Sequence, residues 1–118
     1  MPLLTKLVNA FFARRRKEID FFMEHPLQVQ QRQLRWLLDR AANTVFGREH
    51  GFATLHTAEE YAASVPVADY DTFQSYIART RAGEQNVLWP TEIKWFAKSS
   101  GTTSSKSKFI PVSDEGLQ

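Results

Sequence analysis

The most chemically informative part of this 118-residue chain is a hydroxyl-rich segment near its C-terminal end. Residues 99–108 read Ser-Ser-Gly-Thr-Thr-Ser-Ser-Lys-Ser-Lys, between an aromatic run and a short apolar run. Backbone N–H groups, hydroxyls and ammonium groups are the donors that phosphate oxygens require. Gly101 lets the backbone approach such an anion closely. The composition therefore predicts a loop that binds the phosphates of a nucleotide.

Two other kinds of loop share part of this composition, a P-loop and a surface turn without function. A P-loop also joins glycine, hydroxyl residues and lysine, but it has a second glycine and a helix that begins at the lysine. Here the second glycine is missing, and Phe109-Ile110-Pro111 favours a strand, so the P-loop is rejected. A mobile surface turn without function stays open, because serine and threonine clusters are common in loops.

The composition excludes several classes of protein. The chain has no cysteine, which rules out disulfides and thiolate metal sites. Its three histidines are far apart, and no metal ligand is assigned. The formal charge of +2 does not by itself indicate a nucleic-acid partner. No apolar stretch approaches the roughly 20 residues of a membrane span. We therefore expect a cytoplasmic globular protein with no nucleic-acid or membrane partner.

Helical periodicity dominates the first 85 residues. Apolar residues recur at helical spacing from Leu3 to Met23, and His25 precedes a proline, which ends that helix. Pro26 then suits the first turn of a second helix that runs as far as Val45. We expect these two helices to pack as an antiparallel pair.

Two shorter helices are expected next. Residues 57–60 (Thr-Ala-Glu-Glu) form a capping box that opens a third helix, which must stop near Pro66. Asp69 or Asp71 caps a fourth helix, which ends before Gly83. The expected buried face of that fourth helix consists of Phe73, Tyr76 and Ile77. Its solvated end is expected to carry Arg79 and Arg81.

The pattern changes after residue 85. Ile93 to Lys98 and Lys108 to Val112 predict two short strands on either side of the hydroxyl-rich loop. Ser113 is expected to cap a further helix. A single helical turn and an isolated hairpin are both marginal in water, so we expect the chain to be the N-terminal part of a larger protein. The predicted fold class is α/β, mostly α in this segment.

The loop sequence resembles the first signature of the Gretchen Hagen (auxin-responsive) family of acyl-acid amido synthetases, in which Ser-Ser-Gly-Thr is followed by small residues and Lys. Further segments resemble that family's N-terminal region in the same order, at residues 42–52, 65–70 and 86–90. The similarity is greatest to bacterial members. Ser104 and Ser105 differ from many members, which have at least one glycine there, and Ser107 replaces a frequent proline.

This resemblance implies an enzyme of the adenylate-forming superfamily. Such an enzyme uses ATP to convert a carboxylic acid into an acyl-adenylate, and an amine, often an amino acid, then attacks to form an amide. The residues implied to line the ATP phosphates are Ser99, Ser100, Gly101, Thr102 and Thr103, with Lys108 closing the loop. Magnesium is expected to accompany ATP with ligands from outside this chain.

The resemblance also implies how the chain is organised. Residues 1–118 would be the N-terminal part of a single larger adenylating domain, with a helical region at 1–85 and the hairpin, phosphate loop and start of a helix at 86–118. No catalytic residue is assigned, and the chain alone is expected to be inactive. Two alternatives remain: a small helical interaction module with a Ser-rich tail and, less favoured, a nucleic-acid binder that uses Arg14 to Lys17.

Overall fold

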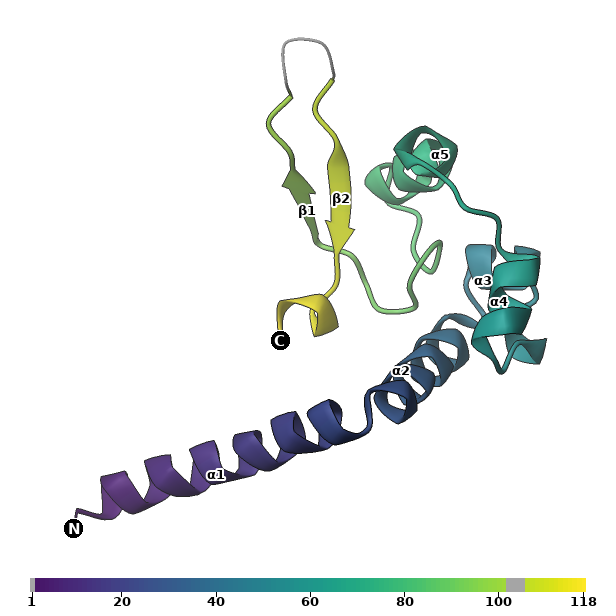
Figure 1. Ribbon diagram of the computed structural model, residues 1–118. Coiled ribbons are helices and arrows are strands. Elements are labelled where there is room, and N and C mark those ends of the chain that lie inside the picture. Colours follow the sequence, from purple (N-terminus) through teal and green to yellow (C-terminus); the bar gives the residue numbers. More distant parts are fainter. Residues whose placement is uncertain (1, 102–105) are drawn as a thin grey trace. The chain divides into compact units, whose positions relative to one another are not determined.

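The computed structural model of the chain describes residues 2–101 and 106–118 (Figure 1). In that part, helices occupy most of the first 81 residues and a two-stranded antiparallel sheet follows. The predicted class, in which helices lead into a β-hairpin, is therefore confirmed. None of the helices described is long and apolar enough to cross a membrane. The chain forms two compact units, residues 1–34 and 35–118, and each is described by itself.

The N-terminal unit contains α1 (Leu3–Glu24) and the first part of α2 (Pro26–Ala41). The break between these helices lies at His25, as the following proline predicts. No residue of α1 is buried, and the connection is one residue long. The expected antiparallel pair is therefore wrong, because a reversal of helix direction needs a loop of about two to five residues.

In the second unit, α2 ends earlier than its apolar pattern predicts. The helix stops at Ala41, although the apolar pattern predicts that it continues to residue 45. The Thr44 hydroxyl donates to the Ala41 carbonyl (2.7 Å) and accepts from the Gly47 N–H (2.9 Å). One buried side chain thus closes α2 and caps the short helix α3 (Val45–Glu49).

The connector at residues 86–87 holds this turn in place. The N–H of Val45 donates to the Asn86 carbonyl, and that of Phe46 donates to the Val87 carbonyl, each at 3.0 Å. The Asn86 amide also donates to the Asn43 carbonyl (2.9 Å). Asn86 has a φ of +57°, which asparagine tolerates better than most residues. This connector therefore lies against the core, with Val87 1% exposed.

The core of the second unit is small and draws on segments far apart in the sequence. Its buried apolar residues are Leu38, Ala41, Phe52, Leu55, Ile77 and Val87. Phe46 extends this core through aromatic contacts. Its ring centroid lies 4.0 to 5.7 Å from the rings of His50, Phe52, Phe73 and Tyr76. These contacts join α3 and the 3₁₀ helix η1 (Phe52–Thr54) to α5 (Tyr70–Arg81).

Both shorter helices begin where the sequence predicts. At α4 (Ala58–Ser64), the Thr57 hydroxyl accepts from the Glu60 N–H and the Glu60 carboxylate accepts from the Thr57 N–H, which is a complete capping box. α5 begins after Asp69, whose carboxylate accepts from a first-turn N–H at 3.0 Å. The structure thereby selects Asp69 from the two candidate caps.

The hairpin consists of β1 (Trp95–Lys98) and β2 (Phe109–Val112), and its register pairs Trp95 with Val112 and Lys98 with Phe109. Both strands are shorter than the sequence predicts. In the turn that follows, the Ser113 hydroxyl accepts from the Gly116 N–H at 3.1 Å, but the N-cap residue is Asp114 where the sequence predicts Ser113. That turn is the 3₁₀ helix η2 (Glu115–Leu117), where the sequence predicts the start of an α-helix.

Substitution of Gly47 by alanine tests the turn at Thr44. A Cβ on Gly47 would lie 2.0 Å from the Ala41 carbonyl oxygen, and this backbone atom cannot move away without breaking the end of α2. We expect Gly47→Ala to destabilise the protein by at least about 2 kcal/mol, measured from urea midpoints. Gly116→Ala is the control, since its Cβ would meet only the Ser113 hydroxyl at 3.4 Å. Equal midpoints for the two variants would contradict this account.

Candidate phosphate-binding site

The base of the hydroxyl-rich loop is closed by two hydrogen bonds between its first and last residues. The Ser99 N–H donates to the Lys108 carbonyl (2.9 Å), and the Lys108 N–H donates to the Ser99 hydroxyl (3.0 Å). The structure thus brings together the two ends of the predicted site. Ser100 and Gly101 follow on the exposed side, while Thr102 and Thr103 lie outside the described residues.

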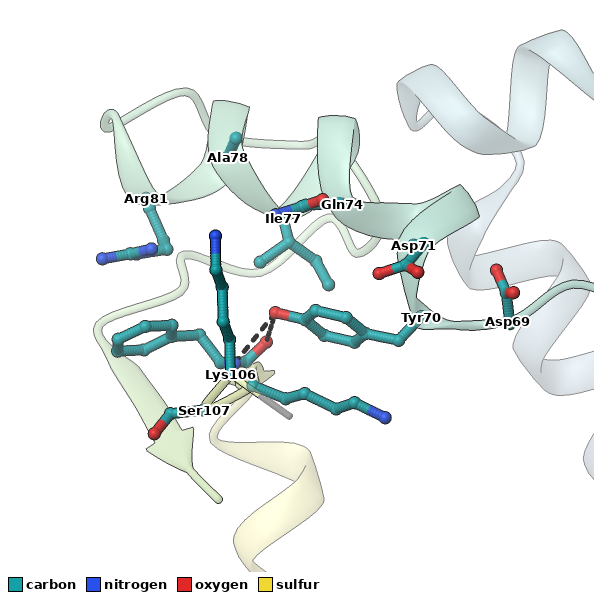
Figure 2. Close-up of a pocket in the computed structure, with 11 residues that line it drawn as sticks. Asp69, Tyr70, Asp71, Gln74, Ile77, Ala78, Arg81, Lys106 and Ser107 are labelled. Carbon is teal, nitrogen blue, oxygen red and sulfur yellow. Dashed lines mark hydrogen bonds between the residues drawn. The ribbon is translucent and has the colours of Figure 1, made fainter. Parts of the chain in front are cut away.

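Tyr70 connects the exit of this loop to α5. Its hydroxyl donates to the Phe109 carbonyl (3.1 Å) and accepts from the Phe109 N–H (2.9 Å), as the dashed lines in Figure 2 show. A phenol can do both because it carries one donor and acceptor lone pairs. Both backbone groups of the residue after Lys108 are therefore held by one half-buried side chain.

A cleft of about 800 Å³ lies between α5 and the loop exit at Lys106–Phe109 (Figure 2). Its wall on α5 carries two carboxylates at the start of the helix, those of the N-cap Asp69 and of Asp71, and one guanidinium at the last residue, Arg81. The opposite wall carries the ammonium groups of Lys106 and Lys108, at the loop exit. The cleft is thus lined by polar and charged groups of both signs beside the predicted phosphate loop.

Hydrogen bonds favour the charged form of Asp69, at the acidic end of the cleft. The Asp69 carboxylate accepts from the N–H (3.0 Å) and the hydroxyl (2.9 Å) of Thr72, and these bonds are the main reason that the pKa of Asp69 lies below its usual value. The charge of Lys108 lowers this pKa further. Accordingly, the Lys108 ammonium lies at this end, 5.5 Å from the centre of the Tyr70 ring.

Arg81 is the member of this cleft that the sequence does not reveal. Arg79 and Arg81 both lie in the last turn of α5, as expected, and Arg81 is exposed. Arg79 donates two 2.7 Å hydrogen bonds to Glu84. Arg81 lies with its guanidinium carbon 3.8 Å from the centre of the Phe109 ring. No local pattern signals this contact, because the two residues are 28 positions apart and meet only when the hairpin packs on α5.

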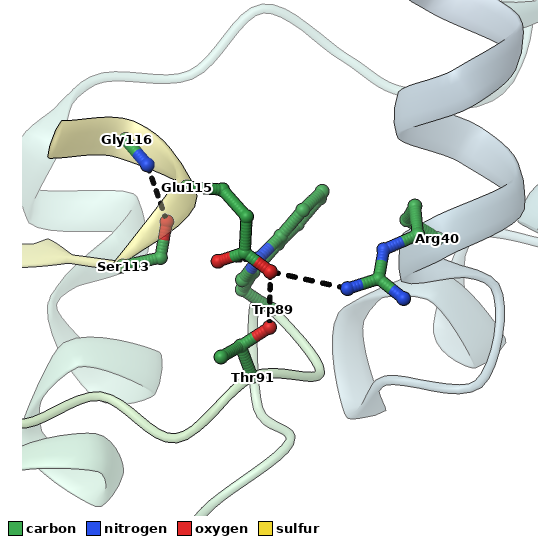
Figure 3. Close-up of polar contacts among 6 residues, drawn as sticks. All are labelled: Arg40, Trp89, Thr91, Ser113, Glu115 and Gly116. Carbon is green, nitrogen blue, oxygen red and sulfur yellow. Dashed lines mark hydrogen bonds and ion pairs between the residues drawn. The ribbon is translucent and has the colours of Figure 1, made fainter. Parts of the chain in front are cut away.

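A second polar cluster surrounds Glu115 (Figure 3). The Glu115 carboxylate accepts from the Thr91 hydroxyl (2.6 Å), the Arg40 guanidinium (3.1 Å) and the Trp89 indole N–H (3.4 Å). These bonds help to lower the pKa of Glu115 to about 2, and the bond from Thr91 has the largest effect. The cluster joins the end of α2, the connector and the turn after β2. It therefore fixes the strand exit far from the loop.

Metal-ion binding has no candidate in the part of the chain that the structure describes, where no three His, Asp or Glu side chains cluster.

Comparison with known proteins identifies the family. Residues 15–118 match the GH3 family N-terminal domain. Because this match covers most of the chain, the chain belongs to the GH3, or Gretchen Hagen, family. The resemblance first recognised in the loop and its flanking segments is thereby confirmed at the level of the family, whose members include acyl-acid amido synthetases.

Several plant enzymes are similar to this chain. It is 29% identical over 102 residues to jasmonoyl–L-amino acid synthetase GH3.5 of Oryza sativa subsp. japonica. It is 34% identical over 85 residues to indole-3-acetic acid-amido synthetase GH3.8 of Oryza sativa subsp. indica, and 32% over 90 residues to indole-3-acetic acid-amido synthetase GH3.6 of Arabidopsis thaliana. These alignments cover 86, 71 and 75% of this chain.

The same alignments cover only 18, 14 and 15% of the relatives, so the chain spans less than a fifth of their length. All three relatives are plant proteins, and these matches give no support to a special closeness to bacterial members.

Replacing Tyr70 by phenylalanine tests the link between loop and helix. The Tyr70→Phe variant leaves the Phe109 N–H and carbonyl without their partner, at a cost of about 1–2 kcal/mol. We expect the Phe109 amide to exchange with solvent roughly 5–30 times faster. Tyr61→Phe is the matched control, since the Tyr61 hydroxyl has no hydrogen bond among the described residues. Unchanged exchange at Phe109 in Tyr70→Phe would show that the link is not formed in solution.

The low pKa of Glu115 predicts a pH dependence of stability. A carboxylate whose pKa falls from the ordinary 4.5 to about 2 on folding stabilises the protein above pH 4.5 and loses this effect as pH falls towards 2. We expect the Tm of the parent protein to exceed that of Glu115→Gln at pH 7, and the difference to shrink between pH 4.5 and 2. Asp114→Asn is the control for removal of a neighbouring charge. A Tm difference that is the same at every pH would contradict the assignment.

Proposed function

We propose that this chain supplies the phosphate-binding loop of an ATP-dependent acyl-acid amido synthetase. The complete protein would adenylate a carboxylic acid and transfer the acyl group to an amine or amino acid. The observation that carries the proposal is the hydroxyl-rich loop of residues 99–108, whose ends meet through Ser99 and Lys108, in a member of the GH3 family.

The chemistry explains why such a loop is needed. A carboxylate oxygen attacks the α-phosphorus of ATP, and the bond from that phosphorus to the bridging oxygen of the β-phosphate breaks. Pyrophosphate leaves with the bonding electrons, and the amine then displaces AMP from the acyl-adenylate. Negative charge grows on the leaving group during the first step, so donors already in position stabilise the transition state without reorganising.

We assign the phosphate contacts to the residues that the family motif indicates, which are Ser99, Ser100, Gly101, Thr102, Thr103 and Lys108. Closure of the loop base supports this assignment, because the ends are held together before any ligand arrives. The anchoring of Phe109 by Tyr70 supports it further, since the loop exit then has one position relative to α5.

The organisation of the complete protein is part of the proposal. We place residues 1–85 in the helical start of the adenylating domain and residues 86–118 in its first hairpin and phosphate loop. Magnesium would bind with ATP through residues elsewhere in that protein. We further expect a cytoplasmic location. We also expect the chain to be more closely related to bacterial members of the family, and a phylogenetic tree of complete sequences tests this relationship. The acid and the amine belong to the same small-molecule classes that the names of the relatives indicate.

The proposal is tested by acid-dependent exchange of pyrophosphate into ATP, measured on the full-length protein with a panel of carboxylic acids. Ser100→Ala and Lys108→Ala each remove a donor to the phosphates, and we expect each to slow the exchange by on the order of 100-fold. Ser75→Ala, which changes an exposed hydroxyl on α5, is the matched control and should leave the rate unchanged.

The outcomes separate the ligase from the helical interaction module. Exchange that requires an acid and collapses in the loop variants supports the ligase. No exchange with any acid, or full exchange in both loop variants, would refute the proposed role of the loop.

A further inference from the structure

Positive charges gather around one aromatic ring at the loop exit. The Arg81 guanidinium carbon lies 3.8 Å from the centre of the Phe109 ring, and the Lys98 ammonium lies 5.7 Å from it. Lys106 lines the same cleft as Arg81. Two of these positive charges therefore lie against one aromatic ring, and the third lines the adjacent cleft. In the described part of the chain, none of the three forms an ion pair.

The carboxylates of the cleft lie far from Arg81 along α5. Asp71 lies ten residues before Arg81 on the same helix, which corresponds to about 15 Å along its axis. That separation is nearly twice the Debye length of about 8 Å at physiological ionic strength. Asp69 is further away still, is engaged by Thr72, and faces the charge of Lys108. At the acidic end of the cleft, Asp69 is thus engaged by Thr72 and faces Lys108, whereas the cationic end, at Arg81 and Lys106, has no ion pair among the described residues.

The cationic end is also preorganised. Arg81 is the last residue of α5, and its guanidinium lies against a ring whose backbone is pinned by the Tyr70 hydroxyl. In Figure 2 the side chain of Lys106 extends towards α5. A planar guanidinium offers a fork of donors that suits two oxygens of a phosphate, and a neighbouring ammonium adds a mobile point charge.

We propose that the cationic end of this cleft binds the pyrophosphate portion of the nucleotide, with Arg81 and Lys106 as its ligands. This proposal rests on the proposed function and extends it from the loop to α5. The same two residues serve the β- and γ-phosphates of ATP before the reaction and free pyrophosphate after it, because the oxygen chemistry is the same. The cleft volume of about 800 Å³ leaves ample room for either.

The test measures binding of pyrophosphate to the full-length protein by calorimetry, beside the exchange assay. We expect Arg81→Gln and Lys106→Gln each to raise the Kd for pyrophosphate by about tenfold or more, and Arg81→Lys, which keeps the charge but loses the fork, to have a smaller effect. The matched control is Arg79→Gln on the same helix, whose native side chain is engaged by Glu84. It should leave the Kd unchanged.

A kinetic readout separates this role from a structural one. In the exchange reaction, Arg81→Gln should raise the KM for pyrophosphate and leave the KM for the carboxylic acid unaltered. Comparing titrations with pyrophosphate alone and with an uncleavable ATP analogue distinguishes free pyrophosphate from the nucleotide tail as the ligand.

The failures of the two proposals are distinguishable. If the parent protein exchanges normally and Arg81→Gln and Lys106→Gln retain its Kd and KM values, the inference is overturned while the ligase stands. If the parent protein shows no exchange yet binds pyrophosphate through Arg81, the proposed function falls and the anion site remains. If the parent protein does not bind pyrophosphate at all, the site is refuted.

Discussion

The geometry of the candidate site depends on one phenolic hydroxyl. Tyr70 satisfies both the N–H and the carbonyl of Phe109, and so fixes the first residue of β2 against the start of α5. This link joins the two walls of the cleft, and Arg81 contacts the Phe109 ring only when that strand is in place. A short sheet with few partners is thus positioned by a polar contact, where larger sheets rely on buried apolar area.

The hairpin is secured at both ends by contacts of this kind. The Glu115 carboxylate, in the turn after β2, accepts from Arg40 of α2 and from Trp89 and Thr91 of the connector, while Tyr70 holds the strand start. Between these anchors the apolar cover is thin, and Trp95 of β1 is 63% exposed. The buried Thr44 turn and the Asn86 connector are joined to each other by hydrogen bonds within the small core. The two strands are therefore positioned by a few polar side chains on a small core.

Local sequence signals predicted local structure well. The break at His25-Pro26, the capping box at Thr57 and the cap at Asp69 each follow from residue types within one helical turn, and the structure has all of them. The end of α2 was mispredicted because the apolar pattern continues past Ala41, while the Thr44 hydroxyl and the distant Asn86 carbonyl decide where the helix stops. Periodicity carries no information about such long-range partners.

The same limit applies to the candidate site. The hydroxyl-rich loop and its lysine are contiguous in sequence, so their composition predicts anion binding and carries the family resemblance. The roles of Tyr70 and Arg81 arise from contacts across 39 and 28 positions, which only the folded chain reveals. The prediction of an antiparallel helix pair is wrong for a local reason. The single residue between α1 and α2 is too short a connection for the chain to reverse direction.

The most direct test of the central claim is a crystal structure of the full-length protein with an ATP analogue that resists cleavage between its α- and β-phosphates. The account predicts phosphate oxygens within about 3 Å of N–H and hydroxyl groups in residues 99–108. Phosphates bound to other segments, with these residues turned towards solvent, would contradict it.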